Sequence, residues 1–174
     1  EGMKQLGAGI SYSGDGPCSV YCKVRPQNNR PKNPVIDCKE SGSTLRFLIP
    51  LSIVLNNRCS FTGSKKLFER PLDVYFNIFE KQNIIYSAND KPLYIKGNLK
   101  ADTFEISGKV SSQFISGLFF ALPLLASDSQ VIITDSLESK DYVYMTIDVM
   151  KKFGVIIRQI NDNSFYIKGN QNYI

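Results

Sequence analysis

Two short segments rich in hydroxyl groups carry residue types that could bind an anion. Residues 40–44 read Glu-Ser-Gly-Ser-Thr and residues 110–113 read Val-Ser-Ser-Gln, and each precedes a long apolar run typical of a buried helix. Backbone N–H groups at the start of a helix suit a phosphate. Either loop alone is better interpreted as a plain N-cap formed by Ser43 or Ser112. Two equivalent loops favour a binding site.

The segments before the second helices add three candidates. Arg70 stands just outside a predicted helix N-terminus, where the helix dipole gives it no stabilisation, so an anionic ligand or a surface pair with Glu69 or Glu40 would explain it. Ser139 suits an N-cap whatever the function. Tyr142 belongs either to the site or to the core stripe of its helix.

The composition excludes several kinds of chemistry. The chain has no histidine, which removes Ser-His, Cys-His and His-metal arrangements. Its cysteines lack the paired spacing of a zinc site, and two that stand four apart on one strand would lie roughly 13 Å from each other, too far to bridge. We predict free buried thiols in a reducing cytoplasm, at Cys18, Cys22, Cys38 and Cys59.

Length and composition predict a globular chain of one domain. The sequence has 174 residues, 43% of them hydrophobic and 21% charged, with a net charge of +5. This mild excess favours a solvated surface over a nucleic-acid site. The longest apolar run, residues 114–126, is interrupted by Pro123 and is too short to span a membrane. We therefore expect a cytoplasmic protein with neither nucleic acid nor membrane as a partner, and no signal peptide is visible.

An internal repeat organises the chain. The string Tyr-Ile-Lys-Gly-Asn occurs at residues 94–98 and again 72 positions later. A second echo pairs Met-Lys-x-Leu-Gly at residues 3–7 with Met-Lys-x-Phe-Gly at residues 150–154, about twice that spacing. The two echoes predict units of about 72 residues.

Each full unit is predicted to be βαβαββ, which gives an α+β fold of units packed around buried helices with sheets outside. The middle unit (34–98) has strands at 35–38, 59–62, 84–87 and 93–96 and helices at 44–55 and 71–82. The last unit (101–170) has strands at 103–107, 131–134, 155–160 and 164–168 and helices at 113–125 and 140–153. Residues 1–27 supply the tail of a first unit, so the single domain 1–174 is expected to be incomplete at its N-terminus; the linker between units is 27–34.

Three details of the helices follow from local rules. Pro50 and Pro123 should end or kink the two apolar helices. Pro71 is well placed as the first residue of its helix. The core stripe of the last helix is expected to consist of Tyr142, Met145, Val149 and Phe153.

Four longer segments resemble the 5-enolpyruvylshikimate-3-phosphate synthase family, in family order and at family spacing. They are ESGSTLRFLIPL from residue 40, FTGSKKLFERPLDVY from residue 61, GKVSSQFISGLFFALPLL from residue 108 and ESKDYVYMTIDVMKKFG from residue 138. The resemblance covers nearly all of residues 35–170. It implies domains of three βαβαββ units and a transfer of the enolpyruvyl group of phosphoenolpyruvate to the 5-hydroxyl of shikimate 3-phosphate, with release of phosphate and no cofactor.

The resemblance also implies roles for individual residues. Those expected to bind shikimate 3-phosphate are Ser111, Ser112, Gln113, Ser139 and Tyr142. Those expected to bind phosphoenolpyruvate are Gly42, Arg46, Arg70 and Gln113. Gly42 would use its backbone N–H, Arg46 would support the loop, and Gln113 would touch both substrates.

Departures from the family pattern limit what is expected of this chain. Glu40 to Ser43 stand where the commonest loop reads Asn-Ala-Gly-Thr, and Phe47 replaces a frequent proline, so sensitivity to glyphosate is open. The family's general acid and base and its second domain have no counterpart, so we expect the 174 residues alone to bind substrates and not to catalyse.

Two other functions compete with this interpretation. One is a UDP-N-acetylglucosamine enolpyruvyl transferase domain, which usually carries a reactive cysteine where residues 63–66 read Gly-Ser-Lys-Lys. The other is a phosphate-binding module with no catalytic role. The sequence does not specify an oligomeric state.

Overall fold

The computed structural model describes residues 2–13, 21–26, 31–87, 92–137 and 139–174, with the backbone alone for 12–13 and 21–26. Some expectations lie outside this description. They concern the distance between Cys18 and Cys22, residues 27–30 of the predicted linker, and Glu138.

The middle unit folds as the sequence predicts, with one added helical turn. Its elements are β3 (Val35–Asp37), α2 (Gly42–Asn56), β4 (Arg58–Thr62), α3 (Lys65–Phe68), α4 (Asp73–Gln82), β5 (Ile85–Ser87) and β6 (Leu93–Lys96). The sheet order is β3-β4-β6-β5, with β3 parallel to β4 and the other pairs antiparallel. The short helix α3 was not predicted; Ser64 caps it by accepting a hydrogen bond from the Leu67 N–H.

The last unit repeats this topology. Its elements are β7 (Thr103–Ile106), α5 (Ser112–Ala121), a 3₁₀ turn (Leu122–Leu124), β8 (Ser129–Ile133), α6 (Lys140–Lys152), β9 (Ile157–Asn161) and β10 (Ser164–Ile167). The sheet order is β7-β8-β10-β9, with only β7 and β8 parallel. Tyr94 pairs with Ser60 and its repeat partner Tyr166 pairs with Gln130, so the two copies of the repeated string occupy the same place in each sheet.

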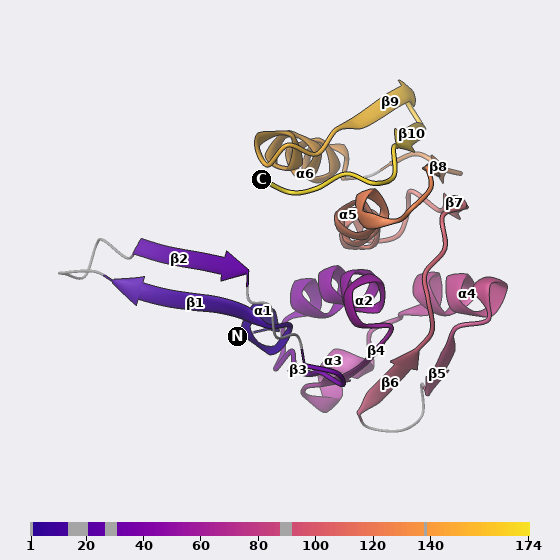
Figure 1. Cartoon of the computed structure of the whole chain (residues 1–174). Coiled ribbons are helices and arrows are strands. Elements are labelled where there is room, and N and C mark those ends of the chain that lie inside the picture. The colour runs from indigo at the N-terminus through magenta and orange to yellow at the C-terminus, as the bar shows by residue number, and fades with distance from the viewer. Residues whose placement is uncertain (1, 14–20, 27–30, 88–91, 138) are drawn as a thin grey trace.

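The N-terminal segment packs on the middle unit. It contains α1 (Gly2–Gln5), β1 (Ala8–Ser13) and β2 (Tyr21–Pro26), and the two strands form an antiparallel ribbon that projects from the body (Figure 1). The side chain of Gln5 accepts a hydrogen bond from the Asp37 N–H of β3. Gly7 and Gly154 both follow a helix at positive φ, 94° and 81°, so the second sequence echo marks two equivalent helix ends.

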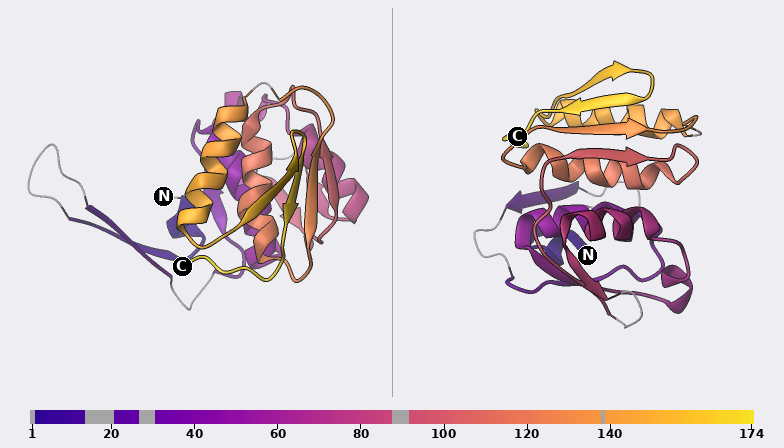
Figure 2. Two further views of the ribbon diagram at one scale, coloured as in Figure 1. Left: turned by 90° about the horizontal axis from the view of Figure 1, so that it is seen from above. Right: turned by 90° about the vertical axis from the view of Figure 1, so that its right-hand side faces the viewer.

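Helices α2 and α5 lie side by side in the middle of the molecule, with the two four-stranded sheets on the outside (Figures 1 and 2). Their contact surfaces are apolar, and residues such as Ile49, Ile115 and Phe119 are completely buried. Phe119 meets Phe165 of the last sheet edge to face, with ring centroids 5.4 Å apart. The α+β fold with buried helices and outer sheets is therefore confirmed.

The two prolines behave differently. α5 ends at Ala121 and continues as a 3₁₀ turn that contains Pro123, as predicted. α2 runs through Pro50 to Asn56, so Pro50 does not end the helix, and the alternative that it kinks the helix stays a prediction. Proline has no N–H, and the carbonyl four residues earlier, that of Arg46, loses its helical donor. The hydroxyl of Tyr75 takes that place, at 2.6 Å.

Two further expectations for the helices were wrong. α4 begins at Asp73 with Leu72 at its cap position, so Pro71 lies outside the helix. The predicted stripe of α6 faces outward: Tyr142, Met145, Val149 and Phe153 are 63, 55, 44 and 52% exposed, whereas Val143 and Met150 are buried. Both faces of this helix carry apolar side chains, so periodicity alone did not select the buried one. No helix in the described part of the chain is long and apolar enough to cross a membrane.

Candidate functional site

The two hydroxyl-rich loops each cap a buried helix, with a different serine from the one expected. In α2 the hydroxyl of Ser41 accepts a hydrogen bond from the Thr44 N–H at 3.1 Å. In α5 the hydroxyl of Ser111 accepts one from the Gln113 N–H at 3.4 Å. The interpretation of Ser43 and Ser112 as caps was therefore wrong, because the helices begin earlier than their apolar runs.

Four of the predicted site residues meet where the starts of α2 and α5 approach each other. Nη1 of Arg46 donates a hydrogen bond to Oε1 of Gln113 at 2.9 Å. A Cβ atom at position 42 would lie 2.9 Å from Nη1 of Arg70, 3.2 Å from Nη1 of Arg46 and 3.8 Å from Oε1 of Gln113. The two guanidinium groups therefore share the space that the missing side chain of Gly42 leaves open.

Among the residues that the structure describes, this cluster carries positive charge without a negative partner. Arg46 is half-buried and lies over the ring of Phe114, with 4.9 Å between the guanidinium carbon and the ring centroid. Its buried Nε has no acceptor in the part of the chain that the structure describes. Burial and the neighbouring Arg70 lower the pKa of Arg46, while Tyr75 opposes the shift. Within the described residues neither Arg46 nor Arg70 forms an ion pair. An anion bound between them would supply the missing acceptors.

The other predicted residues stand nearby at the starts of α5 and α6. Ser112 is buried next to Gln113, and Ser111 is exposed. Ser139 occupies the N-cap position of α6, as expected, but its side chain makes no capping hydrogen bond to the described residues. Tyr142 is exposed one turn further on.

A contact between the two helices indicates that these residues face the same end of the unit. The hydroxyls of Ser116 on α5 and Thr146 on α6 are 2.8 Å apart. Both helices run back against the parallel strands β7 and β8, so their N-termini point the same way. Ser112 and Tyr142 each precede that contact by one helical turn. No hydrogen bond within the described residues joins Ser139 or Tyr142 to the cluster formed by Gly42, Arg46, Arg70 and Gln113.

Sequence reasoning missed two residues that hold Arg46. Phe114 supports the guanidinium with its ring, and Tyr75 binds the Arg46 carbonyl. The missed signal was Pro50, since a proline inside a helix leaves the carbonyl four residues earlier in need of a donor. The sequence does not show that the donor comes from α4.

The two thiols that the structure describes are unsuited to nucleophilic chemistry. Cys38 and Cys59 are buried and free, as expected. Burial, with Asp37 adding to it, raises the pKa of Cys38 to about 12, and burial raises that of Cys59 to about 11 although its contact with Ser52 opposes the shift. Both are protonated at neutral pH. In the part of the chain that the structure describes, no three Cys, Asp or Glu side chains are placed to hold a metal ion.

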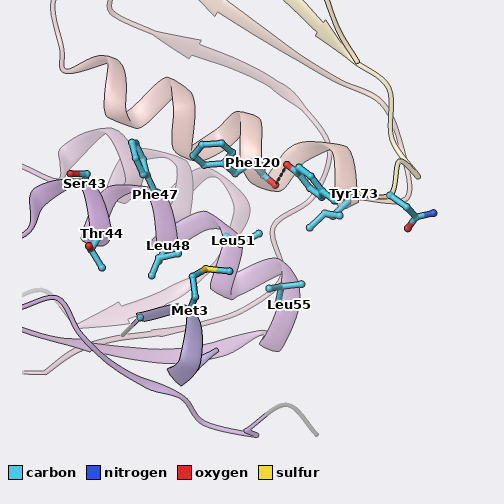
Figure 3. Close-up of a pocket in the computed structure, with 12 residues that line it drawn as sticks. Met3, Ser43, Thr44, Phe47, Leu48, Leu51, Leu55, Phe120 and Tyr173 are labelled. Carbon is cyan, nitrogen blue, oxygen red and sulfur yellow. Dashed lines mark hydrogen bonds between the residues drawn. The ribbon is translucent and has the colours of Figure 1, made fainter. Parts of the chain in front are cut away.

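A cavity with a mainly apolar lining lies beside the charged cluster (Figure 3). It has a volume of about 810 Å³ and is lined mainly by apolar side chains, among them Phe47, Leu51 and Phe120. Tyr173 closes one side, where its hydroxyl donates to the Phe120 carbonyl at 2.9 Å. Only Ser43 and Thr44 of the hydroxyl-rich loops reach it, and none of the described residues that line it is charged. This apolar cavity is therefore separate from the candidate anion site.

Comparison with known proteins connects the whole chain with one family. Residues 1–174 match the family model described as EPSP synthase (3-phosphoshikimate 1-carboxyvinyltransferase). Two similar relatives, both named 3-phosphoshikimate 1-carboxyvinyltransferase, come from Clostridium perfringens and Clostridium acetobutylicum. They are 49 and 51% identical over 175 and 174 residues, which covers 99 and 98% of this chain.

The same alignments cover a minor part of the relatives. The chain spans 41 and 40% of the lengths of these two proteins. Among solved structures, EPSP synthase from Acinetobacter baumannii matches 99% of this chain and 38% of its own, with a TM-score of 0.71 at 15% identity. At that identity the structural match supports the fold alone.

Proposed function

The chain belongs to the EPSP synthase family, and we propose that it is the part of such an enzyme that binds the phosphate groups of its two substrates. The proposed reaction transfers the enolpyruvyl group of phosphoenolpyruvate to the 5-hydroxyl of shikimate 3-phosphate and releases phosphate. The chain spans about two fifths of its relatives' lengths, so the activity of the whole protein is part of the proposal.

One observation carries the proposal: two guanidinium groups, Arg46 and Arg70, converge on the first turn of α2 without an ion pair among the described residues. Gly42 keeps this space open and offers its backbone N–H at the positive end of the helix. A guanidinium fork matches the oxygens of a phosphate group. We assign Gly42, Arg46, Arg70 and Gln113 to the phosphate of phosphoenolpyruvate.

The hydroxyl-rich end of the last unit is proposed for the second substrate. Ser111, Ser112 and Ser139 would hold the 3-phosphate of shikimate 3-phosphate, and Tyr142 would pack beside the ring. The hydrogen bond between Gln113 and Arg46 supports a role for Gln113 at both substrates, because it connects the two groups of residues. The two phosphates would then lie on either side of Gln113.

These residues position charge and do not move protons. As phosphate leaves, negative charge develops on its oxygens, and fixed guanidinium and N–H donors stabilise it without reorganising. The cluster of Gly42, Arg46, Arg70 and Gln113 contains no carboxylate or lysine that could act as a general acid or base. We propose that a second domain, of the kind for which the relatives' remaining length leaves room, supplies those groups, and that the 174 residues bind substrates without turnover.

Titration of the chain followed by NMR tests the site assignment. Phosphoenolpyruvate is expected to shift the amide and guanidinium signals of Gly42, Arg46 and Arg70. Shikimate 3-phosphate is expected to shift the amides of residues 111–113 and 139. Two or three charge-assisted contacts of roughly 1.5 to 3 kcal/mol each, weakened by an open site, correspond to millimolar affinity, about −4 kcal/mol.

Inorganic sulfate is the control ligand. Equal shifts from sulfate at all of these residues would reduce the site to a general anion pocket. No shift from either substrate up to several millimolar would contradict the proposed function of this chain.

A further inference from the structure

Tyr75 is a buried polar residue for which the substrate contacts give no role. It lies on α4 and is 1% exposed. Its hydroxyl donates to the Arg46 carbonyl of α2 at 2.6 Å and lies 3.3 Å from the Phe114 carbonyl of α5. Tyr75 therefore stands where α4 meets the two central helices.

The carbonyl that Tyr75 binds is the one that Pro50 leaves without a partner. In a regular helix the N–H of residue 50 would donate to the carbonyl of residue 46, but proline has no N–H. A buried carbonyl without a donor is costly, and the Tyr75 hydroxyl replaces the missing donor from outside the helix. Burial keeps the pKa of Tyr75 well above its usual range, so the hydroxyl remains a donor at every working pH.

Tyr75 also supports the other end of Arg46. Its ring meets the ring of Phe114 edge to face, with centroids 5.0 Å apart and planes at 71°. Phe114 in turn carries the guanidinium of Arg46. The backbone and the charged head of Arg46 are thus both held by contacts that begin at Tyr75.

The surrounding residues leave room for this bond. A Cβ atom at Gly117 of α5 would collide with the Tyr75 hydroxyl and with the Arg46 carbonyl. In the last unit the residue equivalent to Pro50 is Phe120, which has a backbone N–H, so no helix carbonyl is freed there. Thr146, the equivalent of Tyr75, contacts the side chain of Ser116 instead. Only the middle unit joins a freed helix carbonyl to a second helix at this point.

We propose that Tyr75 is a positioning residue of the anion site: its hydroxyl replaces the backbone donor that Pro50 lacks and so holds Arg46 in place against Gln113 and Arg70. The proposal rests on the proposed function for its ligand, phosphoenolpyruvate. Its geometric part, the ordering of Arg46, does not depend on any ligand.

The test is a cycle of Tyr75→Phe and Pro50→Ala, made in the 174-residue chain. With Pro50 present, Tyr75→Phe is expected to weaken phosphoenolpyruvate binding about tenfold. In the Pro50→Ala background residue 50 regains its N–H and can bond the Arg46 carbonyl, so the same change is expected to weaken binding less than twofold. Thr146→Val, which removes the equivalent hydroxyl of the last unit, is the matched control and should leave phosphoenolpyruvate affinity unchanged.

The NMR signal of the Arg46 Nε–H group without ligand is the second readout. We expect it to be shifted and broadened in Tyr75→Phe and restored in the double variant. If Tyr75→Phe does not fold, a double variant that folds and binds like Pro50→Ala alone supports the proposal. An equal loss of affinity in both backgrounds, or an unchanged Arg46 signal in Tyr75→Phe, would overturn it. If the unmodified chain binds no phosphoenolpyruvate, the proposed function fails, and the Arg46 signal still decides the role of Tyr75.

Discussion

The middle unit and the last unit have one topology and place different chemistry at matching positions. Their N-caps, Ser41 and Ser111, correspond, so the next residue of the helix is Gly42 in one unit and Ser112 in the other. Arg46, whose carbonyl contacts Tyr75 of α4, corresponds to Ser116, whose hydroxyl contacts Thr146 of α6. The middle unit thus provides an open backbone and a guanidinium where the last unit provides hydroxyls.

The second helices of the two units differ in what covers them. Val74 and Ile78 of α4 are half-buried and line a cavity against β7 of the last unit. The corresponding residues of α6 are Met145 and Val149, which are 55 and 44% exposed. The difference shows that the repeat fixes which positions are apolar, while burial at those positions depends on whether a neighbouring strand is present.

The largest effect is expected where the two units touch. Gly117→Ala would place a methyl group against the Arg46 carbonyl and the Tyr75 hydroxyl, and would push α2 and α5 apart. We expect a loss of about 3 kcal/mol in the free energy of unfolding, measured by urea denaturation followed by circular dichroism.

Ser116→Ala, one residue away, is the control for that variant. It removes the hydroxyl contact with Thr146 inside the last unit, and about 1 kcal/mol is the expected loss. A Gly117→Ala protein as stable as Ser116→Ala would mean that the two helices can separate freely.

The difference between α4 and α6 is tested with one charge placed at each of two equivalent positions. Val74→Asp would bury a carboxylate against β7 and is expected to destabilise the chain by about 2 kcal/mol. Met145→Asp would add a solvated charge and change stability by less than about 0.5 kcal/mol. If melting curves gave an equal loss of stability for Val74→Asp and Met145→Asp, the outer face of α6 would have to be covered.

A smaller effect on stability is expected at Cys59 of β4 and Ser129 of β8, which pair with the equivalent residues Ile95 and Ile167. Cys59 contacts the Ser52 hydroxyl at 2.9 Å, whereas the buried hydroxyl of the equivalent Ser129 has no hydrogen-bond partner among the described residues. Ser129→Ala should therefore raise the free energy of unfolding by about 1 kcal/mol, and Cys59→Ala should lower it by about the same amount. A destabilised Ser129→Ala protein would indicate a partner for the Ser129 hydroxyl.

The repeat made most of the fold predictable. The strings at residues 94–98 and 166–170 predicted two equivalent units, which the structure confirms, and the all-apolar run from residue 113 predicted a buried helix. The errors arose where two physical effects compete. Pro50 interrupts a helix locally, but packing against α5 and the bond from Tyr75 hold the helix together. The apolar stripe of α6 is real, yet the sequence does not say which elements are available to bury it.

The candidate site was predictable in its parts and not in its assembly. Residue type and position before a predicted helix marked Arg70 and the loops that contain Gly42 and Ser112. The family resemblance added Arg46 and Gln113, and the structure brings Gly42, Arg46, Arg70 and Gln113 together. The support for Arg46 comes from α4 and α5, tens of residues away, so no local pattern could reveal it.

We propose that the middle unit binds phosphoenolpyruvate through guanidinium groups and that the last unit binds shikimate 3-phosphate through hydroxyls. The most direct test titrates Arg70→Lys and Ser112→Ala with each ligand separately by NMR. Arg70→Lys should weaken the binding of phosphoenolpyruvate about tenfold, because lysine lacks the guanidinium fork that matches a phosphate. The same variant should weaken the binding of shikimate 3-phosphate less than twofold. Ser112→Ala should instead weaken the binding of shikimate 3-phosphate more than that of phosphoenolpyruvate. Equal losses for both ligands in both variants, or no loss in either, would contradict the account.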